Sequence, residues 1–131
     1  ITEAAGQTIE CRADASLGEV NVDPERLRHV FINLLTNASK YSGSTTKILL
    51  YAEPAPDGFV RFGVKDQGTG IPPESVAHVF DRFYRVPDQE KKGAGLGLAI
   101  AREIVVAHGG SIACASQVGE GSDFYFLLPI S

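Results

Sequence analysis

Apolar residues recur at helical spacing between positions 23 and 42, and this pattern predicts the longest helix of the chain. The residues that mark its buried side are Leu27, Phe31, Leu34, Ala38 and Tyr41. Asp23 supplies an N-cap and Pro24 occupies the first helical position, where proline is favoured. The sequence therefore predicts a helix that begins after Asp23 and has one side in the core.

A polar stripe runs beside that apolar side. Successive helical residues turn by about 100°, so Asn33, Asn37 and Lys40 fall within a sector of roughly 60°, and Tyr41 lies at its margin. At the edge of a core, an unpaired polar group costs of order 1–3 kcal/mol. We therefore expect a polar partner to meet the stripe, although the two asparagines could instead bond nearby backbone.

Runs rich in β-formers predict six strands around this helix. Their expected ranges are 7–12, 18–22, 45–53, 59–65, 111–116 and 122–128. In the first two, the candidate inward residues are Ile9, Cys11, Val20 and Val22. The turn residues of positions 54–58 predict that the third and fourth strands form a hairpin.

Side-chain alternation in the fourth strand predicts where the carboxylate of Asp66 lies. Val60, Phe62 and Val64 point to one face, and the same parity places Asp66 on the core side of the sheet. A carboxylate there needs a hydrogen-bond donor. In the last strand, the residues that share a face are Phe124, Phe126 and Leu128.

Two further helices are expected. Residues 73–80 suit a short helix, and a longer one follows the glycine-rich segment 93–97. The residues that mark its buried face are Leu96, Ile100, Ile104 and Ala107, and Gly109 supplies a left-handed stop.

Composition narrows the class of protein. A chain of 131 residues with 44% hydrophobic content fits a single domain, here residues 1–131. It shows no apolar run long enough for a membrane span, its first residues lack the basic start and apolar core typical of a signal peptide, and Cys11 and Cys114 are not expected to form a disulfide framework. The net charge of −4 argues against broad nucleic-acid binding, so a small polyanion would need a local positive pocket.

Two glycine-rich motifs are candidates for ligand binding. The first, D-Q-G-T-G-I-P from Asp66, frees the backbone for close approach of a flat ring, although Asp66 could simply bond its own turn. The second, G-A-G-L-G-L-A-I from Gly93, opens a helix and could receive phosphate oxygens, or act as a hinge. It matches neither the dinucleotide fingerprint nor the Walker motif. The polar residues 86–92 before it read as a lid or as a solvated loop.

Taken together, these motifs resemble the catalytic and ATP-binding domain of bacterial sensor histidine kinases, within the superfamily of gyrase B, Hsp90 and MutL. The resemblance covers essentially the whole chain. Residues 33–42 resemble the family's N box, 66–71 its first glycine box, 80–85 its F box, 93–98 its second glycine box, and 119–124 a variant of its last one. It implies an α+β two-layer sandwich of the Bergerat type, with a mixed, mostly antiparallel sheet of about five strands packed on three helices and a mobile ATP lid formed by residues 81–94.

The resemblance also implies roles for particular residues. Asn37 would hold Mg²⁺, and Asn37, Lys40 and Arg85 would carry the catalytic role; Asp66 would accept a hydrogen bond from the adenine amine. The expected ATP-binding residues are Asn33, Asn37, Lys40, Tyr41, Asp66, Gly68, Gly70, Ile71, Phe80, Arg85, Gly93, Gly95, Leu96, Gly97 and Leu98. The sequence departs from the family pattern at Ala94 and Asp123.

The implied activity is transfer of the γ-phosphoryl group of Mg-ATP to a histidine. His29, His78 and His108 lie outside the family's phosphoacceptor setting, so we expect that the chain is a fragment and that its dimerisation and phosphoacceptor domain lies upstream. The other implied partner is a response regulator, with no nucleic acid and no membrane contact by this domain. The implied location is cytoplasmic, in a protein possibly anchored in the inner membrane. Two alternatives stay open: a superfamily ATPase, and a nucleotide-dependent docking module without catalysis.

Overall fold

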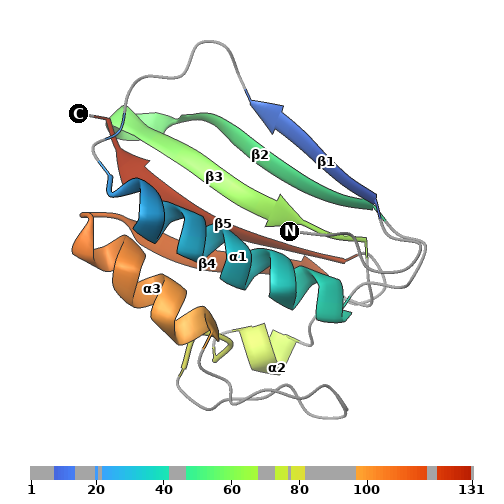
Figure 1. Ribbon diagram of the computed structural model, residues 1–131. Helices are drawn as coiled ribbons and strands as arrows, with labels where there is room; N and C mark the ends of the chain where they lie inside the picture. The colour runs from blue at the N-terminus through green and yellow to red at the C-terminus, as the bar shows by residue number, and fades with distance from the viewer. Residues whose placement is uncertain are drawn as a thin grey trace.

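The computed structural model describes residues 8–13, 20, 22–41, 47–67, 73–76, 78–81, 97–117 and 121–130. These residues form an α+β fold with a single five-stranded sheet (Figure 1). The elements in chain order are β1 (Thr8–Ala13), α1 (Pro24–Tyr41), β2 (Lys47–Ala55), a 3₁₀ turn (Pro56–Gly58), β3 (Phe59–Lys65), α2 (Pro73–Val76), α3 (Gly97–Ala107), β4 (Ser111–Gln117) and β5 (Gly121–Pro129).

The sheet is mixed and mostly antiparallel, as predicted. Its strand order is β1-β2-β3-β5-β4, in which only β1 and β2 are parallel. The predicted hairpin is confirmed as β2 and β3, whose turn places Asp57 and Gly58 at φ of 63° and 80°. β5 then inserts between β3 and β4, so the C-terminal strand lies next to the centre of the sheet.

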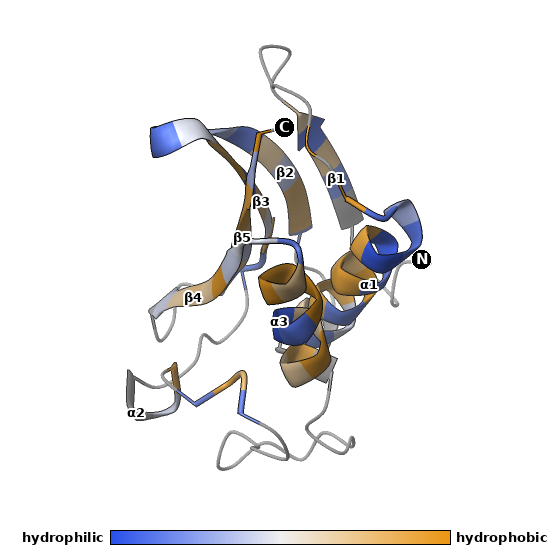
Figure 2. Ribbon diagram, turned by 90° about the vertical axis from the view of Figure 1, so that its left-hand side faces the viewer, coloured by the Kyte–Doolittle hydropathy of each residue, from blue (hydrophilic) through white to orange (hydrophobic). Residues whose placement is uncertain are grey.

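Helices α1 and α3 pack side by side on one face of the sheet (Figures 1 and 2). The core between the layers holds Leu34 and Ala38 of α1, Val64 of β3, and Phe124 and Phe126 of β5, all fully buried. The predicted inward faces of α1, β3 and β5 are therefore confirmed at these positions, because each element turns its apolar side to the same layer.

The N-terminus of α1 has the predicted cap. The Oδ1 atom of Asp23 accepts a hydrogen bond from the backbone N–H of Glu25 at 3.0 Å, and its carbonyl oxygen accepts one from Leu27 at 2.9 Å. An N-cap of this kind satisfies backbone donors that the first helical turn leaves free. No helix in the described part of the chain is long and apolar enough to cross a membrane.

The predicted set of three covering helices is wrong. The helix expected over residues 73–80 is reduced to the four residues of α2, followed by turns at 78–80, so two long helices cover the sheet. Phe80, the first residue of the aromatic and basic cluster 80–85, is buried with its ring against that of Phe124.

Two other predictions need correction. Ala107 is exposed, and the buried residues of α3 are Ala99, Ala101, Ile104 and Val105; Gly109, at φ of 81°, does end the helix. Among the described residues of 18–22, Val20 makes a single bridge with Ile130, and Val22 lies outside any strand.

Cys11 was expected to point inward but is exposed. Its register on β1 does place it on the helix side of the sheet, opposite Leu50 of β2. β1 is one edge strand, whereas α1 packs over β3 and α3 packs over β4 and β5 toward the opposite edge, so neither helix covers this end of the layer. The predicted face of Cys11 is therefore confirmed, whereas its predicted burial is wrong.

Candidate functional site

The two asparagines of the polar stripe on α1 each carry a nitrogen atom without a hydrogen-bond partner in the described part of the chain. Asn33 and Asn37 are half-buried, and the Nδ2 atom of each is buried with no hydrogen-bond partner among the residues that the structure describes. These two nitrogen atoms therefore do not bond the nearby backbone, which was the alternative reading. Buried polar atoms without partners are uncommon and call for an explanation, such as a ligand.

The carboxylate of Asp66 is buried, with only 2% of the residue exposed, as the strand parity predicted. Its Oδ1 atom accepts a hydrogen bond from the backbone N–H of Ser122, and its Oδ2 atom accepts one from the Ser122 hydroxyl, both at 3.2 Å. The backbone N–H of Asp66 in turn donates to the Ser122 carbonyl at 2.8 Å. Three bonds to one residue of β5 thus fix the carboxylate just beyond the end of β3.

Gly121 makes this arrangement possible. It has a φ of 109°, and a Cβ atom built on it would lie 2.2 Å from the carbonyl oxygen of Asp66. Only glycine therefore lets β5 approach the end of β3 this closely. The roles of Gly121 and Ser122 were not predicted from the sequence, although the glycine at the start of the last strand was a signal that could have led to them.

A cavity of about 320 Å³ lies against Asp66, where β3 ends and β5 begins. The residues that line it are Lys65, Asp66, Ala115, Ser116, Gly121, Ser122 and Asp123. Its second carboxylate, Asp123, is bound elsewhere: it accepts hydrogen bonds from the Tyr51 hydroxyl at 2.8 and 2.9 Å and from Arg61 at 3.0 Å. Burial raises the pKa of Tyr51 above its ordinary value, against the opposing effect of Arg61. The two carboxylates in one cavity are therefore held by different partners.

The asparagines and the carboxylate lie at the same end of the fold. Figure 1 shows the C-terminal ends of α1 and β3 together, with the start of β5 beside them. Asn33 and Asn37 belong to this half of α1. Leu34 and Ala38, their neighbours on the helix, join one buried cluster with Val64, two residues before Asp66. The two parts of the predicted site are therefore on one side of the core.

Other predicted site residues are only partly accounted for. Phe80 is buried with its ring 6.4 Å from that of Phe124 in an edge-to-face contact, and Leu98 is half-buried against the core. The structure describes the backbone of Lys40 and Tyr41 in α1 and of Gly97 at the start of α3. The remaining predicted site residues lie outside the described part of the chain: Gly68, Gly70, Ile71, Arg85, Gly93, Gly95 and Leu96, as does the proposed lid after Asp81.

The family model that matches this chain is described as "Histidine kinase-, DNA gyrase B-, and HSP90-like ATPase", and it matches residues 22–131. The chain is 38% identical over 128 residues to the "Adaptive-response sensory kinase SasA" of Synechococcus sp. (strain JA-2-3B'a(2-13)), and the match covers 95% of this chain and 34% of that protein. It is 40% identical over 111 residues to the "Sensor protein kinase WalK" of Staphylococcus aureus, covering 82% of this chain and 27% of that protein. The chain thus spans about a third of these relatives.

Solved structures show the same fold. The "Mycobacterial sensor histidine kinase MprB" is similar with a TM-score of 0.84 and 29% identity, over 95% of this chain and 84% of that one. Full-length ShkA, in complex with AMPPNP, is similar with a TM-score of 0.83 and 33% identity, over 96% of this chain and 26% of that one. The two-layer architecture and its sheet are therefore shared with known kinase structures.

Proposed function

Because this chain belongs to the histidine kinase-, DNA gyrase B- and HSP90-like ATPase family, we propose that it is the ATP-binding catalytic domain of a sensor histidine kinase. It donates the γ-phosphoryl group of Mg-ATP to a histidine on a separate dimerisation and phosphoacceptor domain of the same longer protein. The single observation that carries the proposal is the buried carboxylate of Asp66, which Ser122 holds at the same end of the fold as the two unpaired amides.

Asp66 recognises the purine. The Asp66 carboxylate is buried and fixed by two donors, so it is an oriented hydrogen-bond acceptor. The exocyclic amine of adenine can donate to it, whereas the ionised phosphates of ATP cannot. Gly70 and Ile71 border the ring, and Tyr41 covers it.

The helix stripe serves the phosphates and their metal ion. Mg²⁺ prefers oxygen ligands and keeps water and phosphate oxygens in its shell, so a single amide oxygen from Asn37 fits it. The orphaned Nδ2 atoms of Asn37 and Asn33 fit the same assignment, because a polar nucleotide offers them acceptors. When bound, the ion would supply charge neutralisation in phosphoryl transfer.

Basic side chains and backbone amides of the chain stabilise the negative charge that remains on the nucleotide phosphates. Lys40 and Arg85 neutralise phosphate oxygens, and Gly95 and Gly97 present backbone amides at the start of α3, where the helix dipole is positive. Phosphoryl transfer asks a protein mainly for positioning and charge stabilisation. The residues 81–94 between these groups form the lid over the bound nucleotide.

Asn33 favours a kinase over a superfamily ATP hydrolase. By the resemblance stated above, the hydrolases carry a glutamate four residues before the magnesium-binding asparagine, where it activates water. Here that position holds an amide, which cannot take a proton at neutral pH. Slow hydrolysis is therefore expected, and the phosphoryl group is kept for the histidine.

The adenine assignment is tested by Asp66→Asn. The amide keeps one acceptor for Ser122 but loses a charge-assisted hydrogen bond of about 1.5–3 kcal/mol, so ATP affinity should weaken roughly 10- to 150-fold. Isothermal titration with ATP and with adenosine measures the change, and circular dichroism checks the fold. The matched control is Asp123→Asn, in the same cavity, which should leave adenosine affinity within twofold. Equal losses in both variants would contradict the assignment.

Phosphotransfer is tested by mixing this chain with purified phosphoacceptor helices and labelled ATP. Label on a histidine supports the kinase, while release of free phosphate supports a hydrolase. Binding without either product supports the docking module. A response regulator is the proposed next acceptor, and the domain acts in the cytoplasm without contacting nucleic acid or membrane.

A further inference from the structure

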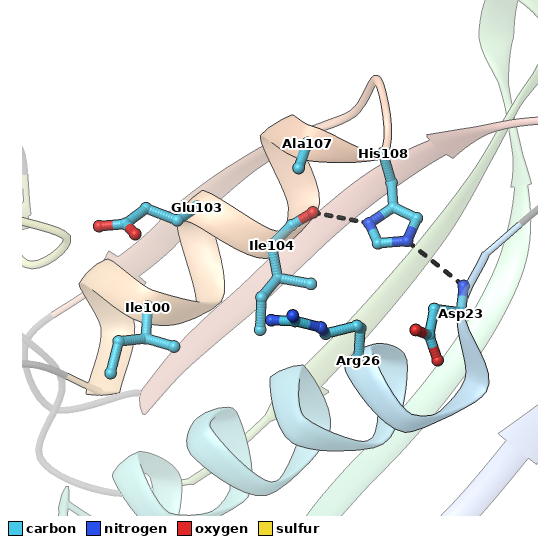
Figure 3. Close-up of a pocket in the computed structure, with 7 residues that line it drawn as sticks. All are labelled: Asp23, Arg26, Ile100, Glu103, Ile104, Ala107 and His108. Carbon is cyan, nitrogen blue, oxygen red and sulfur yellow. Dashed lines mark hydrogen bonds between the residues drawn. The ribbon is translucent and has the colours of Figure 1, made fainter.

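A hollow lies between the first turn of α1 and the side of α3 that runs from Ile100 to His108 (Figure 3). Its volume is about 440 Å³. The residues that line it are Asp23, Arg26, Ile100, Glu103, Ile104, Ala107 and His108. In Figure 3 the side chain of His108 reaches from the end of α3 to the backbone of Asp23, across the mouth of this hollow.

His108 makes one hydrogen bond to each helix. Its Nδ1 atom lies 2.8 Å from the carbonyl oxygen of Ile104 in the last turn of α3, and its Nε2 atom lies 3.3 Å from the backbone nitrogen of Asp23. A carbonyl can only accept and a backbone N–H can only donate, so Nδ1 carries the proton and Nε2 accepts. The ring therefore links the last turn of α3 to the capping residue of α1.

The residues that His108 links lie far along the helices from the proposed nucleotide site. Asn37 is about 21 Å from Asp23 at 1.5 Å per residue, and Gly97 is about 16 Å from His108. The proposed metal ligand is thus at one end of α1, and the proposed phosphate-binding start of α3 is at the corresponding end of the other helix. A small slide or rotation of one helix against the other would change the distance between these two groups.

We propose that His108 is a positioning residue for nucleotide binding, which holds α1 and α3 in the register that the phosphates and their metal ion require. This rests on the proposed function of the domain. The hydrogen bond from the adenine amine does not depend on that register, because Asp66 is held by the sheet through Ser122 of β5, and α1 adds only the cover of Tyr41 over the ring. The loss of the link should therefore affect Mg-ATP and leave adenosine nearly unchanged.

Two substitutions separate the two hydrogen bonds. His108→Asn keeps a donor where Nδ1 lies, next to Ile104, but has no atom that reaches Asp23. His108→Gln extends an oxygen toward the position of Nε2, so it can accept from Asp23 again. Val106→Ala is the matched control, since Val106 is 58% exposed in the same helical turn.

Titration of each variant with Mg-ATP and with adenosine, at a temperature well below unfolding, gives the test. We expect His108→Asn to weaken Mg-ATP about 3- to 10-fold, the range of one net hydrogen bond. Adenosine should stay within twofold, and His108→Gln should recover most of the Mg-ATP affinity.

Equal weakening of both ligands by His108→Asn, or no weakening of either, would overturn the positioning role and leave the proposed function standing. The same holds if His108→Gln is no better than His108→Asn. A wild-type chain that binds neither ligand would overturn the proposed function itself, and the inference with it.

Discussion

Replacing Gly121 with alanine should damage the site through the backbone of Asp66. Two effects add at this position. The φ of 109° is unfavourable for a residue with a Cβ atom, by about 1–2 kcal/mol, and the new methyl group would lie 2.2 Å from the Asp66 carbonyl oxygen. Such overpacking typically costs another 1–3 kcal/mol. We therefore expect Gly121→Ala to lower the free energy of unfolding by about 2–5 kcal/mol.

Gly58 offers a matched control. Its φ is 80°, and a Cβ atom built there would have nothing within 4 Å, so Gly58→Ala carries only the backbone effect of about 1–2 kcal/mol. The difference between the two variants isolates the contact with Asp66. Urea unfolding of both, followed by circular dichroism, measures it.

Nucleotide affinity gives a second measurement on the same pair. The methyl group at position 121 pushes against the backbone that carries the Asp66 carboxylate, so Gly121→Ala should also weaken adenosine, whereas Gly58→Ala should not. If Gly121→Ala is no less stable than Gly58→Ala, the close approach of β5 to the end of β3 is not what holds the carboxylate, and the reasoning fails.

Two further predictions concern the metal ligand and the thiols. Asn37→Ala should depress Mg-ATP affinity and phosphotransfer more than adenosine affinity, and an equal fall in titrations of both ligands would mean that Asn37 only supports the fold. Burial raises the pKa of Cys114 to about 12, whereas Cys11 is exposed, so a thiol reagent should label Cys11 first in the native chain. The same raised pKa means that the unfolded thiol loses its proton above about pH 9 while the folded one keeps it. Stability should therefore fall as pH rises from 9 toward 12, and urea midpoints that fall equally in Cys114→Ala would argue against this cause.

The local patterns of the sequence were sufficient to predict which residues of α1 and β3 face the core. The helical period placed Leu34 and Ala38 in the core, and Asp23 capped the helix, because both effects act within a few residues along the chain. The strand period carried Asp66 to the inner side for the same reason. With these two elements, sequence also determined that amides and a carboxylate would be candidates for one site.

Only the tertiary structure decided what holds that carboxylate. Asp66 and Ser122 are 56 positions apart, and their contact depends on β5 lying beside β3 in one register. The same long-range packing left Cys11 exposed on an edge strand and placed His108 against Asp23. Strand order and the meeting of helix ends follow from how whole layers fit together, and no short stretch of sequence contains that information.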